Sequence, residues 1–330
     1  MKKALITGIF GQDGGFLLEL LADLGYEVHG VVRQKLSDNS SRIKEELESN
    51  GYIPFVHVVD VCNYNELKDL ICELQPDEIY HLAAVHVSSE WNSQTSGIFY
   101  DKELFDRNVL ATSNILSVCW NYLKNAKLVF AGSCLMFDNS RTKIQTEKTP
   151  FNSKSLYGLA KITENALVKY YRSKGLHCST AILYNHESHR RSIDFVTKKI
   201  VSNMVKILRG EINTFSLGNI STQKDWGYAK EYVEAMCLMA QAKVADDYII
   251  SSGTLHSIKD FIDICANKLK IDDWEKHVKI DPQIISRKLS SQLLGSNLKI
   301  QKKLDWKPLV NLERLIEIMI DHEIKYACSK

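Results

Sequence analysis

The sequence predicts an α/β protein in which a doubly wound parallel sheet of the Rossmann type is joined to a smaller mixed C-terminal lobe. Three observations support this fold class. Short apolar runs alternate with amphipathic stretches through the first half, a glycine-rich turn follows the first run, and the alternation gives way to mixed elements after about residue 186. Strands separated by helices need right-handed crossovers, so a doubly wound sheet is the simplest topology.

The predicted elements follow one another along the chain. Six apolar runs have the length and composition of buried strands: Ala4–Thr7, Glu27–Val32, Phe55–Val59, Glu78–Leu82, Lys127–Ala131 and Cys178–Leu183. Helical spacing is present in Phe16–Leu24, Tyr64–Leu74, Asp101–Leu123 and Tyr157–Lys174, and later in Ile193–Arg209 and Leu312–Tyr326. We expect a first domain over residues 1–185, to which 223–250 returns, and a second lobe formed by 186–222 and 251–330.

Composition excludes several classes of protein. With 330 residues, 45% apolar and 25% charged, the chain can bury a sizeable core and is not disordered. A net charge of +2 gives no global argument for a nucleic-acid partner. The eight cysteines form no CxxC or Cys/His pairs, so we expect reduced thiols and no metal site. No run approaches the roughly 18 apolar residues that span a bilayer, and we expect a cytoplasmic protein without a membrane segment.

A glycine-rich turn joins the first predicted strand to the first predicted helix. Directly after Thr7 the chain reads Gly8, Ile9, Phe10, Gly11, Gln12, Asp13, Gly14. Glycines permit the tight turn and let a diphosphate approach the N–H groups at the helix N-terminus. This placement predicts dinucleotide binding; the alternative is a glycine turn without a ligand.

The second predicted strand ends in the sequence VVRQK, which offers a cation at Arg33 and no carboxylate. NAD-preferring sites place an acid here to hold the ribose 2′-hydroxyl, whereas an arginine accommodates the 2′-phosphate of NADP. We therefore expect NADP as the cofactor, with NAD possible if Arg33 is only a surface residue. Asp60 and Val61, just after the third predicted strand, are placed to contact the adenine.

Tyr157 and Lys161 lie four residues apart on one face of a predicted helix. A cation at this spacing favours the phenolate, which makes tyrosine a usable acid or base near neutral pH. The same spacing recurs in Tyr64/Lys68, Tyr170/Lys174 and Tyr326/Lys330, so at least three of these pairs are structural. Chain order distinguishes Tyr157, because its helix follows a strand that ends at Ser133. The hydroxyl and the Tyr/Lys pair can converge on one carbonyl beside a nicotinamide, which predicts a hydride-transfer site.

With these residues the chain resembles the extended short-chain dehydrogenase/reductase superfamily, and within it the GDP-mannose 4,6-dehydratases, over nearly its whole length. The matching segments are ALITGIFGQDG, GYEVHGVVR, PDEIYHLAA, YGLAK, YNHESHRR, FVTKKI, LGN followed by KDWGYAKEYV, and LDWKP. Several of them lie in the second lobe, which the resemblance identifies as the sugar-nucleotide lobe. The resemblance also implies a homodimer or a homotetramer.

The resemblance implies residues for two ligands. NADP would be held by the glycine turn together with Arg33, Asp60, Val61, Leu82, Ala83, Ala84, Lys161, His186 and Arg191. A GDP-sugar would be held near Ser133, Asn185, Lys199, Lys224 and Arg287. The cations and amide among these side chains suit phosphate oxygens, and an ordinary solvated face is the alternative for the basic ones.

One departure from the family pattern bears on the reaction. The resemblance implies a strand-end hydroxyl that orients the sugar 4-hydroxyl, then a small polar residue, then a glutamate that takes the C5 proton and helps expel water from C6. The matching residues here are Ser133, Cys134 and Leu135, and leucine cannot accept a proton. In addition, RKLSSQ stands where the family has RPTEVD, and Lys224 stands for an arginine, which points to a changed nucleotide or sugar.

We therefore predict an enzyme that performs NADP-dependent hydride transfer at C4 of a GDP-hexose or GDP-heptose in surface-glycan precursor synthesis. It would be a 4-keto reductase, a 4-dehydrogenase or a 4-epimerase. Tyr157 would exchange a proton with O4, Ser133 would share the hydrogen bond, and Lys161 would hold the cofactor ribose and tune the phenol. One alternative is a GDP-mannose 4,6-dehydratase with a displaced base, for which Cys134, His86 and His189 are candidates. The other is a catalytically silent nucleotide-binding homologue.

Overall fold

The structure is a computed structural model of the chain that describes residues 1–85, 98–282, 284 and 292–328. Its centre is a seven-stranded sheet in which every neighbouring pair is parallel. The strand order is β10 (Tyr248–Ile250), β6 (His177–Leu183), β5 (Lys127–Ala131), β4 (Glu78–His81), β1 (Lys3–Thr7), β2 (Glu27–Val32) and β3 (Phe55–Val58). This arrangement confirms the predicted doubly wound α/β fold.

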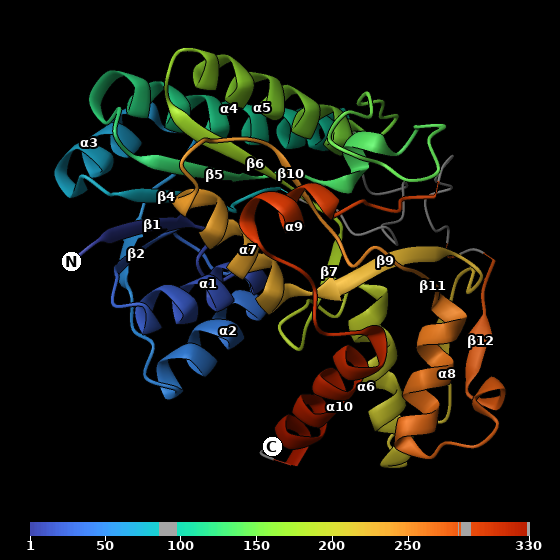
Figure 1. The fold of residues 1–330 in the computed structure, drawn as a ribbon. Coiled ribbons are helices and arrows are strands. Elements are labelled where there is room, and N and C mark those ends of the chain that lie inside the picture. The colour runs from blue at the N-terminus through green and yellow to red at the C-terminus, as the bar shows by residue number, and fades with distance from the viewer. Residues whose placement is uncertain (86–97, 283, 285–291, 329–330) are drawn as a thin grey trace.

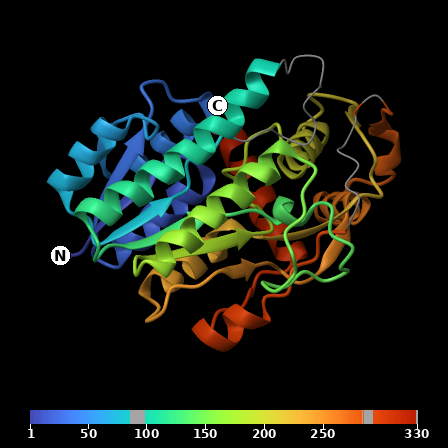
Figure 2. The same ribbon diagram turned by 90° about the horizontal axis from the view of Figure 1, so that it is seen from above.

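Helices cover both faces of the sheet (Figure 1). On one face lie α1 (Gln12–Asp23), α2 (Asp38–Ser49) and α7 (Ala229–Gln241), and their apolar side chains share one core with β1 and β10. On the other face lie α3 (Tyr64–Leu74), α4 (Ile98–Tyr122) and α5 (Leu156–Ser173). Figure 2 shows α4 and α5 running side by side along the sheet. Because both faces are covered, the strands are buried and read as continuous apolar runs.

Two elements of the large sheet and its covering helices were not predicted from periodicity. Helix α2 buries only Ile43 and Leu47, and it begins at the Ser37 cap, whose side chain accepts a hydrogen bond from the Ser40 N–H. Strand β10 has three residues, which is too short for a period to show. In addition, α1 begins at Gln12 instead of Phe16, because the glycine turn leads directly into the helix.

The remaining elements form a second group beside the carboxyl ends of the large sheet's strands (Figure 1). Helices α6 (Val196–Leu208), α8 (Ile258–Leu269) and α10 (Leu312–Cys328) pack around a core of their own with the pair β8 (Phe215–Leu217) and β12 (Val278–Ile280). A small sheet, in the order β11 (Leu255–Ser257), β9 (Gln223–Tyr228) and β7 (Asn185–Glu187), connects this part to the large sheet. The 3-10 helices η1 (Cys134–Phe137) and η2 (Trp274–Lys276) and helix α9 (Leu298–Leu304) complete the described elements. None of the described helices is long and apolar enough to cross a membrane.

Candidate active site

The turn between β1 and α1 has the backbone that its glycines predict. Gly8 has a φ of +76°, in the left-handed region that favours glycine, and its carbonyl accepts a 2.9 Å hydrogen bond from the Gly11 N–H. Gly11 then serves as the extended cap residue of α1, without a capping side chain of its own. The first N–H groups of α1 are therefore available to an anion at the carboxyl edge of the sheet.

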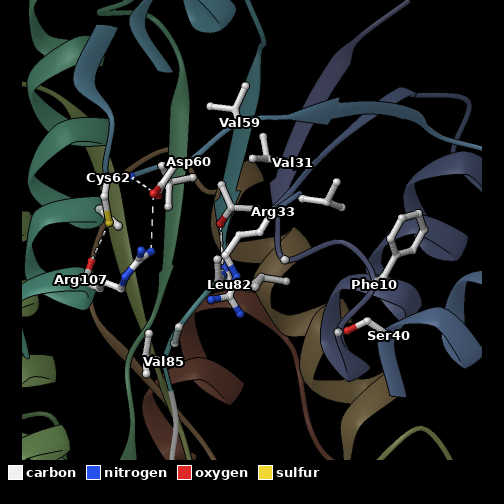
Figure 3. A pocket seen from close by; sticks show the side chains of 18 of the residues that line it. Phe10, Val31, Arg33, Ser40, Val59, Asp60, Cys62, Leu82, Val85 and Arg107 are labelled. Atoms are coloured by element: carbon white, nitrogen blue, oxygen red, sulfur yellow. Dashed lines mark hydrogen bonds and ion pairs between the residues drawn. The ribbon is translucent and has the colours of Figure 1, made fainter. Parts of the chain in front are cut away.

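A first cavity opens beside this turn, at the carboxyl ends of β1, β2, β3 and β4 (Figure 3). Nine of the predicted cofactor residues line it: Gly8, Phe10, Gly11, Arg33, Asp60, Val61, Leu82, Ala83 and Ala84. Ile9, Gln12 and Gly14 do not line it, because Ile9 and Gly14 are packed into the core and Gln12 contacts the His186 segment.

The charges around the first cavity are unevenly distributed. Arg33, Lys35 and the hydroxyls of Ser37 and Ser40 lie on the β2 side. Among the described residues that line the cavity, Asp60 carries the sole carboxylate, and it is held by the Arg107 guanidinium at 3.6 Å and by the Cys62 N–H at 3.0 Å. The β2 side therefore suits a phosphate better than a bare ribose hydroxyl.

A second cavity adjoins the first at Leu82 and Ala84, where β5 and β6 end. Among the side chains that line it are eight predicted site residues: Asp13, Ser133, Tyr157, Lys161, Asn185, His186, Arg191 and Lys224. Cys134 and Leu135 lie on the same wall. The topology thus gathers predicted site residues as far apart in the sequence as Asp13 and Lys224 around one space.

Helix α5 brings Tyr157 into this cavity through its first turn. Ser155 caps the helix and accepts a 3.1 Å hydrogen bond from the Gly158 N–H. Gly158 lies so close to η1 that a Cβ atom would be 2.4 Å from the Leu135 carbonyl oxygen. This close approach, which only glycine allows, places Tyr157 against the segment that carries Ser133 and Leu135.

Tyr157 and Lys161 are both buried, at 8% and 3% exposure, and the Lys161 Nζ lies 5.7 Å from the centre of the Tyr157 ring. Lys161 favours the phenolate of Tyr157 as expected, but other effects on the Tyr157 pKa are larger in sum. Burial raises the pKa of Tyr157, Lys161 lowers it, and Glu164 raises it, with a net increase. The phenol therefore keeps its proton near neutral pH.

Ser133 ends the β5 segment with an extended backbone and caps η1. Its Oγ accepts a 3.2 Å hydrogen bond from the Leu135 N–H, and its side chain lines the cavity. Cys134 is 5% exposed, and burial raises the pKa of its thiol to about 12. A thiol with that pKa stays protonated and does not serve as a base near neutral pH.

His186 is an imidazolium on hydrogen-bonding grounds. Its Nδ1 lies 2.7 Å from the Tyr184 carbonyl oxygen and its Nε2 lies 2.9 Å from Asp13 Oδ2, so both ring nitrogens face acceptors and both must donate. Burial lowers the pKa of His186, but Asp13 raises it by more. This pair fastens β7 to α1 between the two cavities.

The remaining predicted residues lie elsewhere. Lys199 is half-buried on α6 and does not line either cavity, and Arg287 and His86 fall outside the described residues. His189 lies behind α1, where its Nε2 is 3.0 Å from Glu46 Oε1 and its ring stacks on His322. The proposed role of His189 as a displaced base is wrong, because its side chain is absent from the walls of the second cavity as described.

Glu46, His189 and His322 place their ligand atoms within 4.8 Å of one another, as a metal site would. Arg190 occupies one Glu46 oxygen with two hydrogen bonds of 3.0 and 2.8 Å, and the two rings lie 3.9 Å apart in near-parallel stacking. Stacked rings do not aim their lone pairs at a common point, and a neighbouring guanidinium repels a cation. We therefore interpret this group as a structural cluster.

Sequence reasoning missed two acidic residues of the site. Glu187 lines the second cavity, where Thr197 donates a 2.6 Å hydrogen bond to it and Arg191 lies at 3.2 Å. Glu164 pairs with Lys161 from behind the cavity at 3.0 Å. Its position three residues after Lys161 on the same helix was a usable signal for that contact.

The comparisons with known proteins agree with one another on the kind of protein. Residues 5–319 match the family model described as GDP-mannose 4,6 dehydratase. GDP-mannose 4,6 dehydratase 1 of Arabidopsis thaliana is 35% identical over 334 residues, which is 99% of this chain and 91% of the relative. The human GDP-mannose 4,6 dehydratase is 34% identical over 353 residues, which is 98% of this chain and 91% of the relative.

Solved structures share the fold at much lower identity. A UDP-glucose 4-epimerase from Thermotoga maritima superposes with a TM-score of 0.83 at 18% identity, over 98% of this chain and 99% of that one. A structure of RMD from Pseudomonas aeruginosa complexed with NADPH has a TM-score of 0.79 at 17% identity, over 98% of this chain and all of that one. At these identities the likeness concerns the fold alone.

Proposed function

The chain belongs to the GDP-mannose 4,6-dehydratase family, and from this premise we propose that it performs NADP-dependent hydride transfer at C4 of a GDP-hexose or GDP-heptose without eliminating water. The observation that carries the proposal is the wall of the second cavity. There Ser133, Tyr157 and Lys161 stand together, and the position after Cys134 is Leu135. The first three residues suffice for chemistry at C4, whereas leucine provides no base for chemistry at C5.

The two cavities fit the proposed ligands. The glycine turn, Arg33 and Asp60 would hold the diphosphate and adenosine part of NADP in the first cavity, and Lys161 with His186 would hold its ribose in the second. A bound nicotinamide supplies or accepts the hydride. Arg33 and the hydroxyls beside it favour NADP over NAD, since a 2′-phosphate needs cations and donors. Asn185 and Lys224 would contact the sugar nucleotide.

The pKa of Tyr157 determines the form in which this residue enters the C4 reactions. Burial and Glu164 raise that pKa beyond the opposing effect of Lys161, so the resting phenol carries its proton. A protonated phenol donates to O4 as a ketone is reduced, whereas oxidation of an alcohol requires the phenolate. The proposal covers a 4-keto reductase, a 4-dehydrogenase and a 4-epimerase, because a tyrosine of ordinary pKa is also protonated near neutral pH before each of these reactions.

Among the residues that the structure describes, two acidic groups line the second cavity, and both are engaged. Asp13 is bonded to His186, and Glu187 is bonded to Thr197 and Arg191. Each of these carboxylates supports the position of a neighbouring side chain, and neither replaces the missing base without breaking its contacts. This supports C4 chemistry without elimination.

A second candidate function is a 4,6-dehydratase with a displaced base. The names of the relatives that match across nearly the whole chain favour it. Glu187 is then the strongest candidate for the base, since it is a carboxylate on the cavity wall. To act, it must leave either the Thr197 hydroxyl or the Arg191 guanidinium.

Mass spectrometry of GDP-mannose and of a GDP-heptose, incubated separately with the purified protein and NADP, distinguishes the candidates. Loss of two hydrogens, or turnover only of an added 4-keto sugar, supports C4 chemistry. Loss of one water establishes a dehydratase and refutes the interpretation of Leu135. Binding of NADP without any change in these sugars supports a catalytically silent homologue. Light scattering of the same sample tests the expected homodimer or homotetramer.

A further inference from the structure

Behind the candidate active site lies an ion pair of which only the lysine reaches the cavity. Lys161 Nζ lies 3.0 Å from Glu164 Oε2, and the two side chains are 3% and 5% exposed. The Thr112 hydroxyl, from α4, donates a 2.9 Å hydrogen bond to the same carboxylate oxygen. Glu164 is absent from the cavity wall, whereas Lys161 is part of it. The carboxylate therefore contacts the site only through the lysine.

The other groups around Lys161 carry no compensating charge. Tyr157, on the same helix, is a neutral phenol near neutral pH. On β4, His81 is neutral as well: Thr7 Oγ1 accepts from the Leu82 and Ala83 N–H groups, so its own hydrogen goes to His81 Nδ1. Burial and the charge of Lys161 lower the pKa of His81 to about 3.

The charged and titratable groups that face Tyr157 from other elements are Arg191 and the Cys134 thiol. Arg191 is itself paired with Glu187, and the thiol remains protonated near neutral pH. Neither group neutralises the ammonium of Lys161. Glu164 is thus the negative partner of Lys161 among the residues that the structure describes.

We propose that Glu164 is a positioning residue for the C4 reaction. Its carboxylate keeps Lys161 in the ammonium form and fixes the direction in which the Lys161 N–H groups donate. The inference rests on the proposed role of Lys161 in the site. An ammonium has three N–H groups, and Glu164 takes one of them from behind. The other two are left for the cavity side, beside Tyr157, where a cofactor ribose would bind. Glu164 therefore acts on the reaction through Lys161 and does not touch the reacting atoms.

The pKa shifts agree with this geometry. Burial lowers the pKa of Lys161, whereas Glu164 and Tyr157 raise it, and the net change is an increase. Without the carboxylate, the lysine loses both the charge and the hydrogen bond that oppose burial, which favours neutral lysine. A neutral Lys161 loses its electrostatic effect on the phenol and the charge on its hydrogen bonds.

A stability measurement that needs neither cofactor nor substrate tests the proposal. In the wild type, the raised folded-state pKa makes the contribution of Lys161 present at neutral pH and lost only as pH rises through that value. In Glu164→Gln, burial lowers the folded-state pKa below the unfolded one, so the protonated lysine destabilises the fold and stability recovers as pH rises. We expect the unfolding midpoint of Glu164→Gln to lie about 5 °C below the wild type at pH 7, with the gap shrinking toward pH 10.

Two further variants serve as controls. In a Lys161→Met background, Glu164→Gln no longer lowers the midpoint, because the carboxylate has lost its partner. Thr112→Val removes one hydrogen bond to Glu164 and leaves the charge in place, so its smaller loss stays the same at every pH. A gap that stays constant from pH 7 to 10, or that persists in the Lys161→Met background, overturns the proposal.

Cofactor binding provides the second readout. We expect the affinity of Glu164→Gln for NADPH, measured by fluorescence titration, to fall about tenfold between pH 7 and pH 9 while the wild type changes little. Glu164→Asp retains the charge and restores part of the difference. If the stability pattern appears but no GDP-sugar is turned over, the role of Glu164 stands and the proposed reaction fails. If the wild type reduces a 4-keto sugar and the pH-dependent gap is missing, only the inference about Glu164 fails.

Discussion

Helix α5 carries the same Tyr-x-x-x-Lys spacing at both ends, and the two ends differ in almost everything except that spacing. In Tyr157/Lys161 the ammonium lies 5.7 Å from the ring centre, and in Tyr170/Lys174 it lies 5.4 Å away. Tyr157 is 8% exposed and lines a cavity, whereas Tyr170 is 56% exposed on the surface. The spacing therefore supplies only a contact. Burial at the carboxyl edge of the sheet, with Glu164 behind the lysine, turns the contact into a candidate acid.

The largest effect that separates the two ends is expected from Tyr157→Phe and its control Tyr170→Phe. Removal of the Tyr157 hydroxyl should reduce hydride transfer about 1,000-fold, because no other described hydroxyl on the cavity wall combines the same burial with an adjacent ammonium. The absorbance of NADPH at a fixed GDP-sugar concentration measures this rate. Binding of NADPH should change little, since the ring remains.

Tyr170→Phe should leave the rate within twofold of the wild type, because its ring and hydroxyl lie on the surface. The proposed difference between the two tyrosines is contradicted if both variants retain turnover, or if Tyr170→Phe is as slow as Tyr157→Phe. Either result would mean that the position on α5 does not decide which tyrosine reacts.

The second largest expected effect is on stability, and it distinguishes Lys161 from Lys174. Lys161→Met leaves the Glu164 carboxylate buried without its partner, which should cost about 3–5 kcal/mol of unfolding free energy. Lys174→Met removes a surface ammonium and should change the unfolding free energy by less than about 0.5 kcal/mol. Urea unfolding at pH 7 measures both.

The double variant Lys161→Met with Glu164→Gln should regain much of the lost stability, because no buried charge is left. Equal losses in Lys161→Met and Lys174→Met would contradict the difference in burial on which the comparison rests.

The two ends of α5 also show how far the sequence alone could be used. Periodicity located the helix to within a residue, and chain order selected Tyr157 because Ser133 directly follows the preceding strand. These signals are local or depend only on topology, and parallel strands place their carboxyl ends at one edge. The selection of Tyr157 as the catalytic residue remains a prediction that the variants above test.

Other features depend on distant segments and could not be predicted. The raised pKa of Tyr157 follows mainly from its burial in the folded chain, which no local pattern contains. Strand β10 has three residues and is defined by its pairing with β6. His186 and His189 are three residues apart and look alike in the sequence, but only the fold shows that His186 faces the cavity and His189 faces Glu46.

Arg33 tests whether burial is needed for a functional role, as the comparison of Tyr157 with Tyr170 suggests. It is exposed like Tyr170, and we nevertheless expect it to bind the cofactor. It follows β2 on the wall of the first cavity (Figure 3), which Lys35 also lines. Arg33→Ala should lower the preference for NADPH over NADH about 30-fold, since the 2′-phosphate loses a charge-assisted partner. The ratio of kcat/KM for the two cofactors measures this preference.

Lys35→Ala is the matched control for Arg33→Ala and should change the ratio less, because a flexible ammonium matches a phosphate less well than a guanidinium. An unchanged ratio in Arg33→Ala would argue against NADP as the preferred cofactor. Arg33 would then be a surface residue without a role in cofactor binding.

The smallest expected effect is that of Ser133→Ala, and it separates two roles of one hydroxyl. Ser133 Oγ accepts the Leu135 N–H as the cap of η1, and it also lines the cavity where it would share the hydrogen bond to O4. We expect kcat to fall about tenfold with unchanged NADPH binding, together with a loss of about 1 kcal/mol from the missing cap.

Ser155→Ala isolates the cap, because Ser155 Oγ accepts the Gly158 N–H at the start of α5 and does not line the cavity. It should lose a similar amount of stability and keep kcat within twofold, while Ser133→Thr should keep both functions of the hydroxyl. If Ser155→Ala lowers kcat as much as Ser133→Ala does, the effect of Ser133 comes from the backbone that it holds. Ser133 would then be a cap that happens to face the cavity, and Tyr157 would supply the only side-chain hydrogen bond to O4.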